Sequence, residues 1–162
     1  MVRKEVHMAE YLANQVQQVA LNSAVQNFVA SIPCNRGNVY HNDGSGIFIL
    51  RGPRDGQCYA TYNVLFSANV GIPEGSTAGV PIALALSVNG EEWQASRGIF
   101  FPTITDETGA YGNIICPANI KVPRGCCFNV AVRYVAGTSD PTVTPAPVID
   151  VQNASLQITR TS

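Results

Sequence analysis

Charged side chains are scarce in this sequence. Asp, Glu, Lys and Arg make up 13% of it, whereas an average soluble domain holds about 25%. The 10 Lys and Arg residues stand against 11 Asp and Glu residues, so no basic excess attracts nucleic-acid phosphates or an anionic membrane surface. A surface with so little charge indicates that part of it is covered in an oligomer. We therefore expect a homo-oligomer and no nucleic-acid partner.

Long apolar runs are absent as well. The longest apolar stretches have the length of strands, which excludes a transmembrane helix and membrane insertion. The start of the chain carries Arg3 and Lys4, but the residues that follow are rich in Gln and Asn rather than apolar. This pattern is not that of a secretory signal, so synthesis in a cytoplasm is expected.

Groups that could perform chemistry are few. The chain has two histidines, and a Cys-His-Asp set forms only if folding brings Cys58 to His41 and Asp43. Turn and strand contexts account for these residues without catalysis. Five cysteines, an odd number with no C-x-x-C spacing, favour buried reduced thiols over disulfides or a zinc site. We expect no catalytic residue, no metal, no cofactor and no enzyme activity.

The sequence does contain strand alternation punctuated by turns. Four segments place their apolar side chains on one face, and Asn89-Gly90 forms a two-residue hairpin turn after the second of them. The apolar sets are Tyr62, Val64 and Phe66; Ile82, Leu84, Leu86 and Val88; Phe128, Val130, Val132 and Tyr134; and Ala154, Leu156 and Ile158. This pattern predicts a single all-β domain, a jelly-roll β-sandwich over residues 21–162.

Residues 1–20 fit no single pattern. Ala9, Leu12, Val16 and Val19 have helical spacing, whereas residues 16–20 fit a strand nearly as well. We assign residues 1–20 to an N-terminal arm or short helix outside the sandwich.

Two sets of residues are candidate oligomer contacts. Residues 47–50 are apolar on both faces, so Phe48 and Leu50 lie either at the centre of an oligomer or under a loop. Ala83 and Ala85 form a face of small side chains that would let another backbone come close.

Aromatic side chains gather in residues 91–112. Trp93, Phe100, Phe101 and Tyr111 are candidates for a ligand loop that binds a host-cell receptor or a glycan. Residues 137–147, rich in Thr and Pro, are predicted to form a long exposed loop.

The strand at 62–70, the Pro-x-Gly turn after it and the strand at 82–90 resemble the trimeric jelly rolls of the tumour necrosis factor and complement globular-head superfamily. The resemblance implies a homotrimer.

Motifs over most of the chain resemble those of short proteins encoded beside head genes in phages of gut Firmicutes. These motifs are Ala13-Asn14-Gln15, Pro33-Cys34, His41-Asn42-Asp43-Gly44-Ser45-Gly46-Ile47, Leu50-Arg51-Gly52 and Gly125-Cys126-Cys127-Phe128-Asn129-Val130. The resemblance implies a protein made in the bacterial cytoplasm and carried on the virion surface. It implies a role as a capsid decoration (cement) or head-fibre protein that binds the phage major capsid protein.

The arm is the part of the chain that a sandwich does not explain. We therefore expect it to dock on the capsid, with Val6, Tyr11, Leu12 and Val16 as candidate contacts. The alternative functions are a receptor- or glycan-binding knob of a phage fibre and a jelly-roll protein of the bacterial surface.

Overall fold

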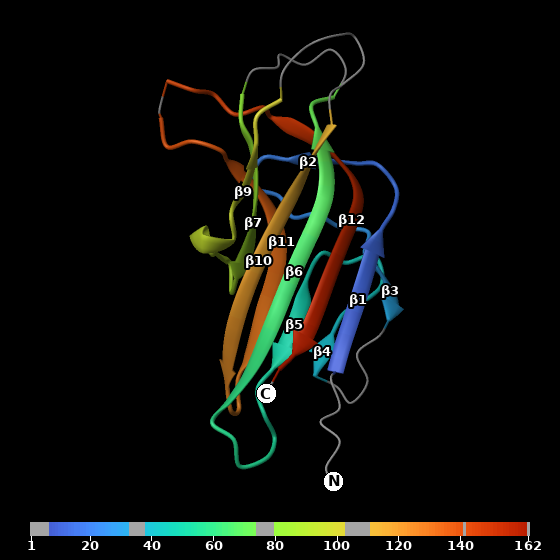
Figure 1. Cartoon of the computed structure of the whole chain (residues 1–162), viewed down its shortest axis with the longest axis vertical. Coiled ribbons are helices and arrows are strands. Elements are labelled where there is room, and N and C mark those ends of the chain that lie inside the picture. Colours follow the sequence, from blue (N-terminus) through green and yellow to red (C-terminus); the bar gives the residue numbers. More distant parts are fainter. Residues whose placement is uncertain (1–6, 33–37, 74–79, 103–110, 141, 162) are drawn as a thin grey trace.

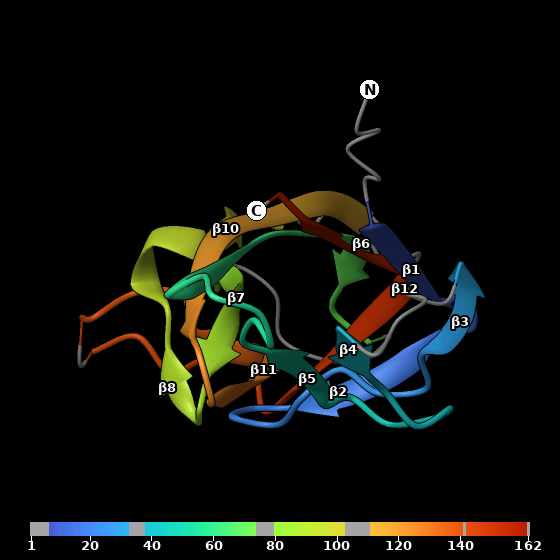
Figure 2. The ribbon, with the colours of Figure 1, turned by 90° about the horizontal axis from the view of Figure 1, so that it is seen from below.

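The structure, a computed structural model, describes residues 7–32, 38–73, 80–102, 111–140 and 142–161. These residues fold into two six-stranded antiparallel sheets (Figure 1). Figure 2 shows the two sheets from below, facing each other across the core. The all-β sandwich predicted from the alternation is confirmed. Within the described residues, no helix is long and apolar enough to span a membrane.

The first sheet, sheet A, contains the three longest strands. Its order is β10-β6-β12-β1-β3, and β2 pairs with β12 beside this path. The strands are β1 (His7–Ala13), β2 (Gln17–Ala20), β3 (Val29–Ile32), β6 (Tyr59–Gly71), β10 (Tyr111–Pro123) and β12 (Val148–Arg160). Strands far apart in the sequence, such as β1 and β12, are neighbours, so the two ends of the described chain are held in one sheet.

The second sheet, sheet B, has shorter strands. Its order is β4-β5-β11-β7-β8, and β9 pairs with β7 beside this path. The strands are β4 (Val39–Tyr40), β5 (Phe48–Arg51), β7 (Ile82–Val88), β8 (Glu91–Glu92), β9 (Gly98–Phe100) and β11 (Cys127–Ala136). A single turn of 3-10 helix, η2 (Gln94–Ser96), lies between β8 and β9. Asn89 and Gly90 have φ of 53° and 86°, as the predicted tight turn between β7 and β8 requires.

The core consists of the inward side chains of both sheets. All four predicted apolar sets point into it, with Val88 and Phe128 packed at its margin. Phe28, Phe48 and Phe66 meet edge to face, with ring centroids 5.2 Å and 6.4 Å apart. The hydroxyl of Tyr62 on β6 reaches the backbone carbonyl of Arg51 on β5, so a polar contact also joins the two sheets.

The structure corrects the assignment to an arm or short helix for residues 7–20, whereas residues 1–6 lie outside the described residues. Residues 7–13 form β1, which lies between β12 and β3 and is bonded to both. Ala9, Tyr11 and Ala13 alternate inward, and Tyr11 packs on Phe48 with ring centroids 4.7 Å apart. Alternation of small alanines is easily mistaken for helical spacing, and neighbouring strands decide between the two.

The structure also corrects the candidate oligomer contacts. Phe48 and Leu50 are fully buried in the core between the sheets, so no second subunit touches them. Ala83 and Ala85 point to the other side of β7, where they are buried with Val135 in a small cluster of the same chain. Their register neighbours on β11, Val135 and Arg133, are larger and flank the two methyl groups. None of these four residues offers a surface to a partner.

Candidate functional site

The outer face of sheet A carries the longest strands of the sandwich. Strands β10, β6 and β12 lie side by side there, and each is 13 residues long. Every second residue of each strand turns away from the core because successive side chains of a strand point to opposite faces. These outward residues define what we call the association face. In its central part they are Thr61, Asn63, Leu65, Ser67, Asn69, Asn113, Ile115, Pro117, Asn119, Gln152, Ser155, Gln157 and Thr159.

No member of this central set is charged. Its amides are arranged as cross-strand pairs: the Asn63 side-chain amide donates to the Asn119 side-chain oxygen at 3.1 Å. Asn113 donates in the same way to Asn69 at 3.4 Å. Such pairs fix the direction of each amide and leave donors and acceptors on the surface. A neutral face with ordered amides can be covered by another protein without burying a charge.

Two exposed aliphatic side chains stand among these amides. Leu65 is 38% exposed and Ile115 is 55% exposed, and Pro117 lies opposite Leu65 in the register of β10 and β6. Ser67 is in register with both Ile115 and Ser155, so small side chains flank the isoleucine across the sheet. Leu65 and Ile115 therefore project from the face, and the small serines beside Ile115 leave shallow depressions. Close packing against a second surface needs both features.

Charges occur only at the margins of the association face. Asp150, near the start of β12, forms a side-chain hydrogen bond with Tyr111, and burial raises the pKa of the Asp150 carboxyl. The pKa of Tyr111 is also raised, first by burial and then by the negative charge of Asp150. Glu10 on β1 accepts hydrogen bonds from Gln157 and Ser31, and Lys121 is exposed at the other end of β10. The charges are thus confined to the margins, and depletion of charged residues at the centre is a feature of protein interfaces.

The predicted ligand loop is divided by the structure. Phe100 pairs with Ile82 at the start of β7, whereas Glu92, next to Trp93, pairs with Ser87 near its end. The two aromatics therefore lie at opposite ends of one strand. Phe101 is exposed just beyond β9.

Phe100 and Tyr111 do lie near each other. A Cβ built on Gly112 would stand 2.1 Å from the Phe100 ring, so the ring packs on the start of β10 beside Tyr111. Residues 103–110 of the predicted loop lie outside the described residues.

The arm candidates are also separated. Tyr11 is buried in the core, and Leu12 is half-buried on the outward side of β1. Val16 is exposed in the turn between β1 and β2, and Val6 lies outside the described residues.

The packing of His41 accounts for its place in the possible Cys-His-Asp set. The His41 ring stacks on Phe48 with centroids 4.4 Å apart, and its Nε2 donates to the Ser45 carbonyl at 2.8 Å. A carbonyl oxygen only accepts, so Nε2 carries a hydrogen in this contact, and the buried Nδ1 has no partner among the described residues. Cys58 is exposed at the start of β6. Across the described ranges, no three His, Cys, Asp or Glu side chains are placed to hold a metal ion.

Sequence reasoning missed the association face. The alternation of β6 gives its outward residues, but the sequence patterns that indicate oligomer contacts are small side chains and strands that are apolar on both faces. The signal that identifies the face is a run of uncharged outward residues on three long strands, and it emerges only when the strand order places those strands together.

Several solved structures have a similar arrangement of strands. The Eiger tumour necrosis factor of S. frugiperda superposes with a TM-score of 0.66 at 9% identity, over 98% of this chain and 94% of that chain. The chain has the same jelly-roll fold. Murine APRIL gives a TM-score of 0.56 at 10% identity over 97% of this chain and 100% of that chain. The globular domain of zebrafish complement 1qA gives 0.55 at 14% identity, over 96% of each chain.

At these identities the likeness to solved structures shows the fold alone. No protein-family model matches the chain, and no curated protein matches it in sequence. The superposition covers nearly the whole chain, β1 and β2 included, which agrees with their place in sheet A.

Proposed function

We propose that this protein is a non-enzymatic structural protein of a phage virion surface, and that it works as a homotrimer built through the association face. The observation that carries the proposal is the neutral outer face of β10, β6 and β12, with Leu65 and Ile115 exposed on it. The three-fold assembly follows the resemblance of the sequence to trimeric jelly rolls.

The size of the face supports this assignment. Three strands of 13 residues, at a rise of about 3.3 Å and a spacing of about 4.8 Å, present roughly 600 Å² before β1 is added. A stable interface buries about 800 Å² on each partner. With the seven residues of β1 the same estimate gives roughly 730 Å², close to the area that one such interface buries on one partner.

A matched pair of isoleucines tests the assembly. Ile115 lies on the association face and Ile99 lies on β9 of sheet B, and their exposed fractions are 55% and 56%. Ile115→Lys would bury an unpaired ammonium group in the trimer, whereas Ile99→Lys would leave its charge in water. Light scattering after size-exclusion chromatography should give a trimer for the wild type and for Ile99→Lys, and a monomer for Ile115→Lys. A monomeric wild type, or equal effects of the two substitutions, would contradict the proposal.

The virion role rests on the resemblance to head-gene neighbours and needs a capsid partner. Because residues 7–13 belong to sheet A, we limit the proposed capsid-binding segment to residues 1–6, which include Val6. Purified capsids that lack the protein should bind the wild-type trimer in co-sedimentation and should not bind a trimer lacking residues 1–6. A wild-type trimer that does not sediment with capsids would remove the decoration role and leave the assembly result standing.

A further inference from the structure

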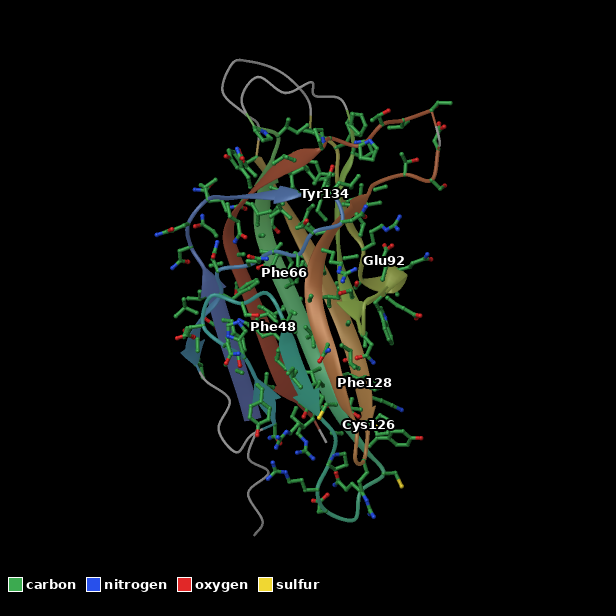
Figure 3. The ribbon with its side chains drawn as sticks, turned by 180° about the vertical axis from the view of Figure 1, so that it is seen from behind. Phe48, Phe66, Glu92, Cys126, Phe128 and Tyr134 are labelled. Carbon is green, nitrogen blue, oxygen red and sulfur yellow. The ribbon has the colours of Figure 1, made fainter. Side chains whose placement is uncertain are left out.

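A hollow of about 390 Å³ lies beside the β7–β8 hairpin, on the opposite sheet from the association face. It is lined by Val88, Asn89, Glu91, Glu92 and Trp93. Trp93 is the only tryptophan of the chain and is 39% exposed. Glu92 lies at the outer edge of the molecule in Figure 3. An aromatic ring left open beside polar side chains is typical of a surface that receives a ligand.

Buried hydrogen bonds hold the backbone of Trp93 in place. The hydroxyl of Ser96, which is fully buried, donates to the Trp93 carbonyl at 2.6 Å and accepts from the Leu86 N–H at 2.8 Å. The Trp93 N–H in turn donates to the Leu86 carbonyl at 2.8 Å. This arrangement ties the short segment after β8 to the central strand β7. The ring therefore leaves from a fixed backbone rather than from a free loop.

The polar groups of the hollow are fixed as well. Arg97 donates to Glu92 Oε1 from Nε at 2.8 Å and from a terminal nitrogen at 2.6 Å, which leaves Glu92 Oε2 as an acceptor. The Asn89 side-chain oxygen accepts from the Asn129 N–H at 2.9 Å, which leaves its NH₂ group as a donor. Preorganised donors and acceptors bind a ligand without paying the entropy of ordering the side chains.

We propose that this hollow is a binding site for a neutral saccharide. One face of a pyranose ring carries C–H groups that pack on an indole, while its hydroxyls both donate and accept hydrogen bonds. Trp93 supplies the ring, Glu91 and Glu92 supply acceptors, and Asn89 supplies a donor. The volume fits one or two sugar rings, and it lies in the range of small-molecule sites.

The charges of the hollow select among possible ligands. Glu92 is paired with Arg97, and the Arg133 guanidinium lies 3.5 Å from the Gly90 carbonyl at the hairpin turn. Among the described residues that line the hollow, Glu91 is the one whose negative charge has no ion-pair partner. That charge repels sialylated or sulfated glycans and the phosphates of nucleotides, although their rings could also stack on Trp93. A single unpaired carboxylate is a weak site for a polycation. The inference rests on the residues that line the hollow and not on the proposed trimer or on capsid binding.

The single tryptophan provides the measurement. The full-length protein is first screened on a glycan array that holds neutral mono- and disaccharides, and fluorescence excited at Trp93 is then titrated with the saccharides that bind. We expect at least one neutral saccharide to change the emission in a saturable way. Sialyllactose and a trilysine peptide serve as charged probes and should not compete. Absence of any neutral saccharide among the binders, or preferred binding of either charged probe, would overturn the proposal.

Calorimetry measures saccharide binding by variants and so locates the site. It does not depend on Trp93 fluorescence, which the Trp93→Ala variant lacks. Trp93→Ala should weaken saccharide binding by about tenfold or more. Phe101→Ala, which removes an exposed aromatic outside the hollow, should leave it unchanged. Glu91→Gln should change neutral-saccharide affinity by less than about threefold and increase the binding of sialyllactose. Equal affinities of Trp93→Ala and the wild type, in proteins that melt at the same temperature, would rule the hollow out.

Discussion

The hydroxyl of Tyr134 on β11 donates to the backbone carbonyl of Ala146 at 2.7 Å, and both residues are buried. Ala146 belongs to the Pro-rich segment that leads into β12, so this bond anchors the end of a segment predicted to be an exposed loop. The adjacent Pro147 carbonyl accepts from the Leu21 N–H at 3.0 Å. The final part of the segment is thus part of the sandwich.

Tyr134→Phe keeps the ring and leaves the Ala146 carbonyl without its donor. We expect a loss of about 1–2 kcal/mol in the free energy of unfolding, because a buried acceptor is left unsatisfied. Chemical denaturation measures it, and Tyr59→Phe, at an exposed tyrosine, is the control with no expected change. Equal stability of Tyr134→Phe and the wild type would show that water replaces the hydroxyl.

Gly46 in the His-x-x-Gly-Ser-Gly motif has a steric reason to be glycine. A Cβ at this position would stand 2.2 Å from the Val25 carbonyl oxygen, a backbone atom that cannot move aside as a side chain would. Gly46→Ala should therefore destabilise the fold by about 2–4 kcal/mol. Gly56 has nothing within 4 Å of its virtual Cβ, so Gly56→Ala should shift the free energy of unfolding by less than about 0.5 kcal/mol. Thermal melting of the two variants checks the difference.

Removal of β1 should unfold the protein. A chain that lacks residues 1–13 loses Tyr11 from the core and leaves backbone groups of β12 and β3 unpaired. A chain that lacks residues 1–6 keeps all of β1 and should melt near the wild-type temperature. Circular dichroism during heating compares the two. A cooperative transition at the wild-type temperature in the longer deletion would mean that sheet A does not need β1.

The strands that sequence analysis placed well are those in which local pattern and tertiary context agree. In the strand around Tyr62, the strand after Ile82 and the last two strands, the larger apolar side chains of the alternation identify the core face. The opposite face is mostly polar in β6 and β12, whereas in β7 and β11 it includes the buried Ala83, Ala85 and Val135. Alternation does not identify the N-terminal strand, β1, because Ala9 and Ala13 are weakly apolar and good helix formers. The pairing of β1 with β3 and with β12, the latter about 150 residues away in sequence, decides its conformation.

The candidate sites depended on contacts that sequence does not show. Trp93 and Phe100 are seven residues apart, yet they lie at opposite ends of β7 because η2 and β9 turn the chain between them. Ala83 was read as an oligomer contact, but its neighbours on β11 cover it within the same chain. Packing across strands, rather than spacing along one strand, determines which side chains are open.

Cys116 on β10 is buried against the Leu84 carbonyl, with Sγ 3.2 Å from that oxygen, and burial raises the pKa of its thiol from 9.0 to about 11. Cys58, Cys126 and Cys127 are exposed. Because the thiolate is the reactive form, iodoacetamide at pH 8 should alkylate the three exposed cysteines and leave Cys116 unmodified until denaturant is added. Peptide mass spectrometry reads each site separately. Alkylation of Cys116 at the rate of Cys127 in the folded protein would contradict the burial.

The same thiol should make stability depend on alkaline pH. The folded state keeps the proton on Cys116 up to about pH 11, whereas the unfolded chain releases it near 9.0, so the unfolded state is favoured as pH rises through this window. Over this window the free energy of unfolding falls by about 2–3 kcal/mol because of Cys116. Cys116→Ala removes the titrating group, so its free energy of unfolding should fall less steeply between pH 9 and about pH 11 than that of the wild type. Comparing slopes rather than absolute stabilities separates the titration from the small cavity that the substitution leaves, because the cavity is the same at every pH.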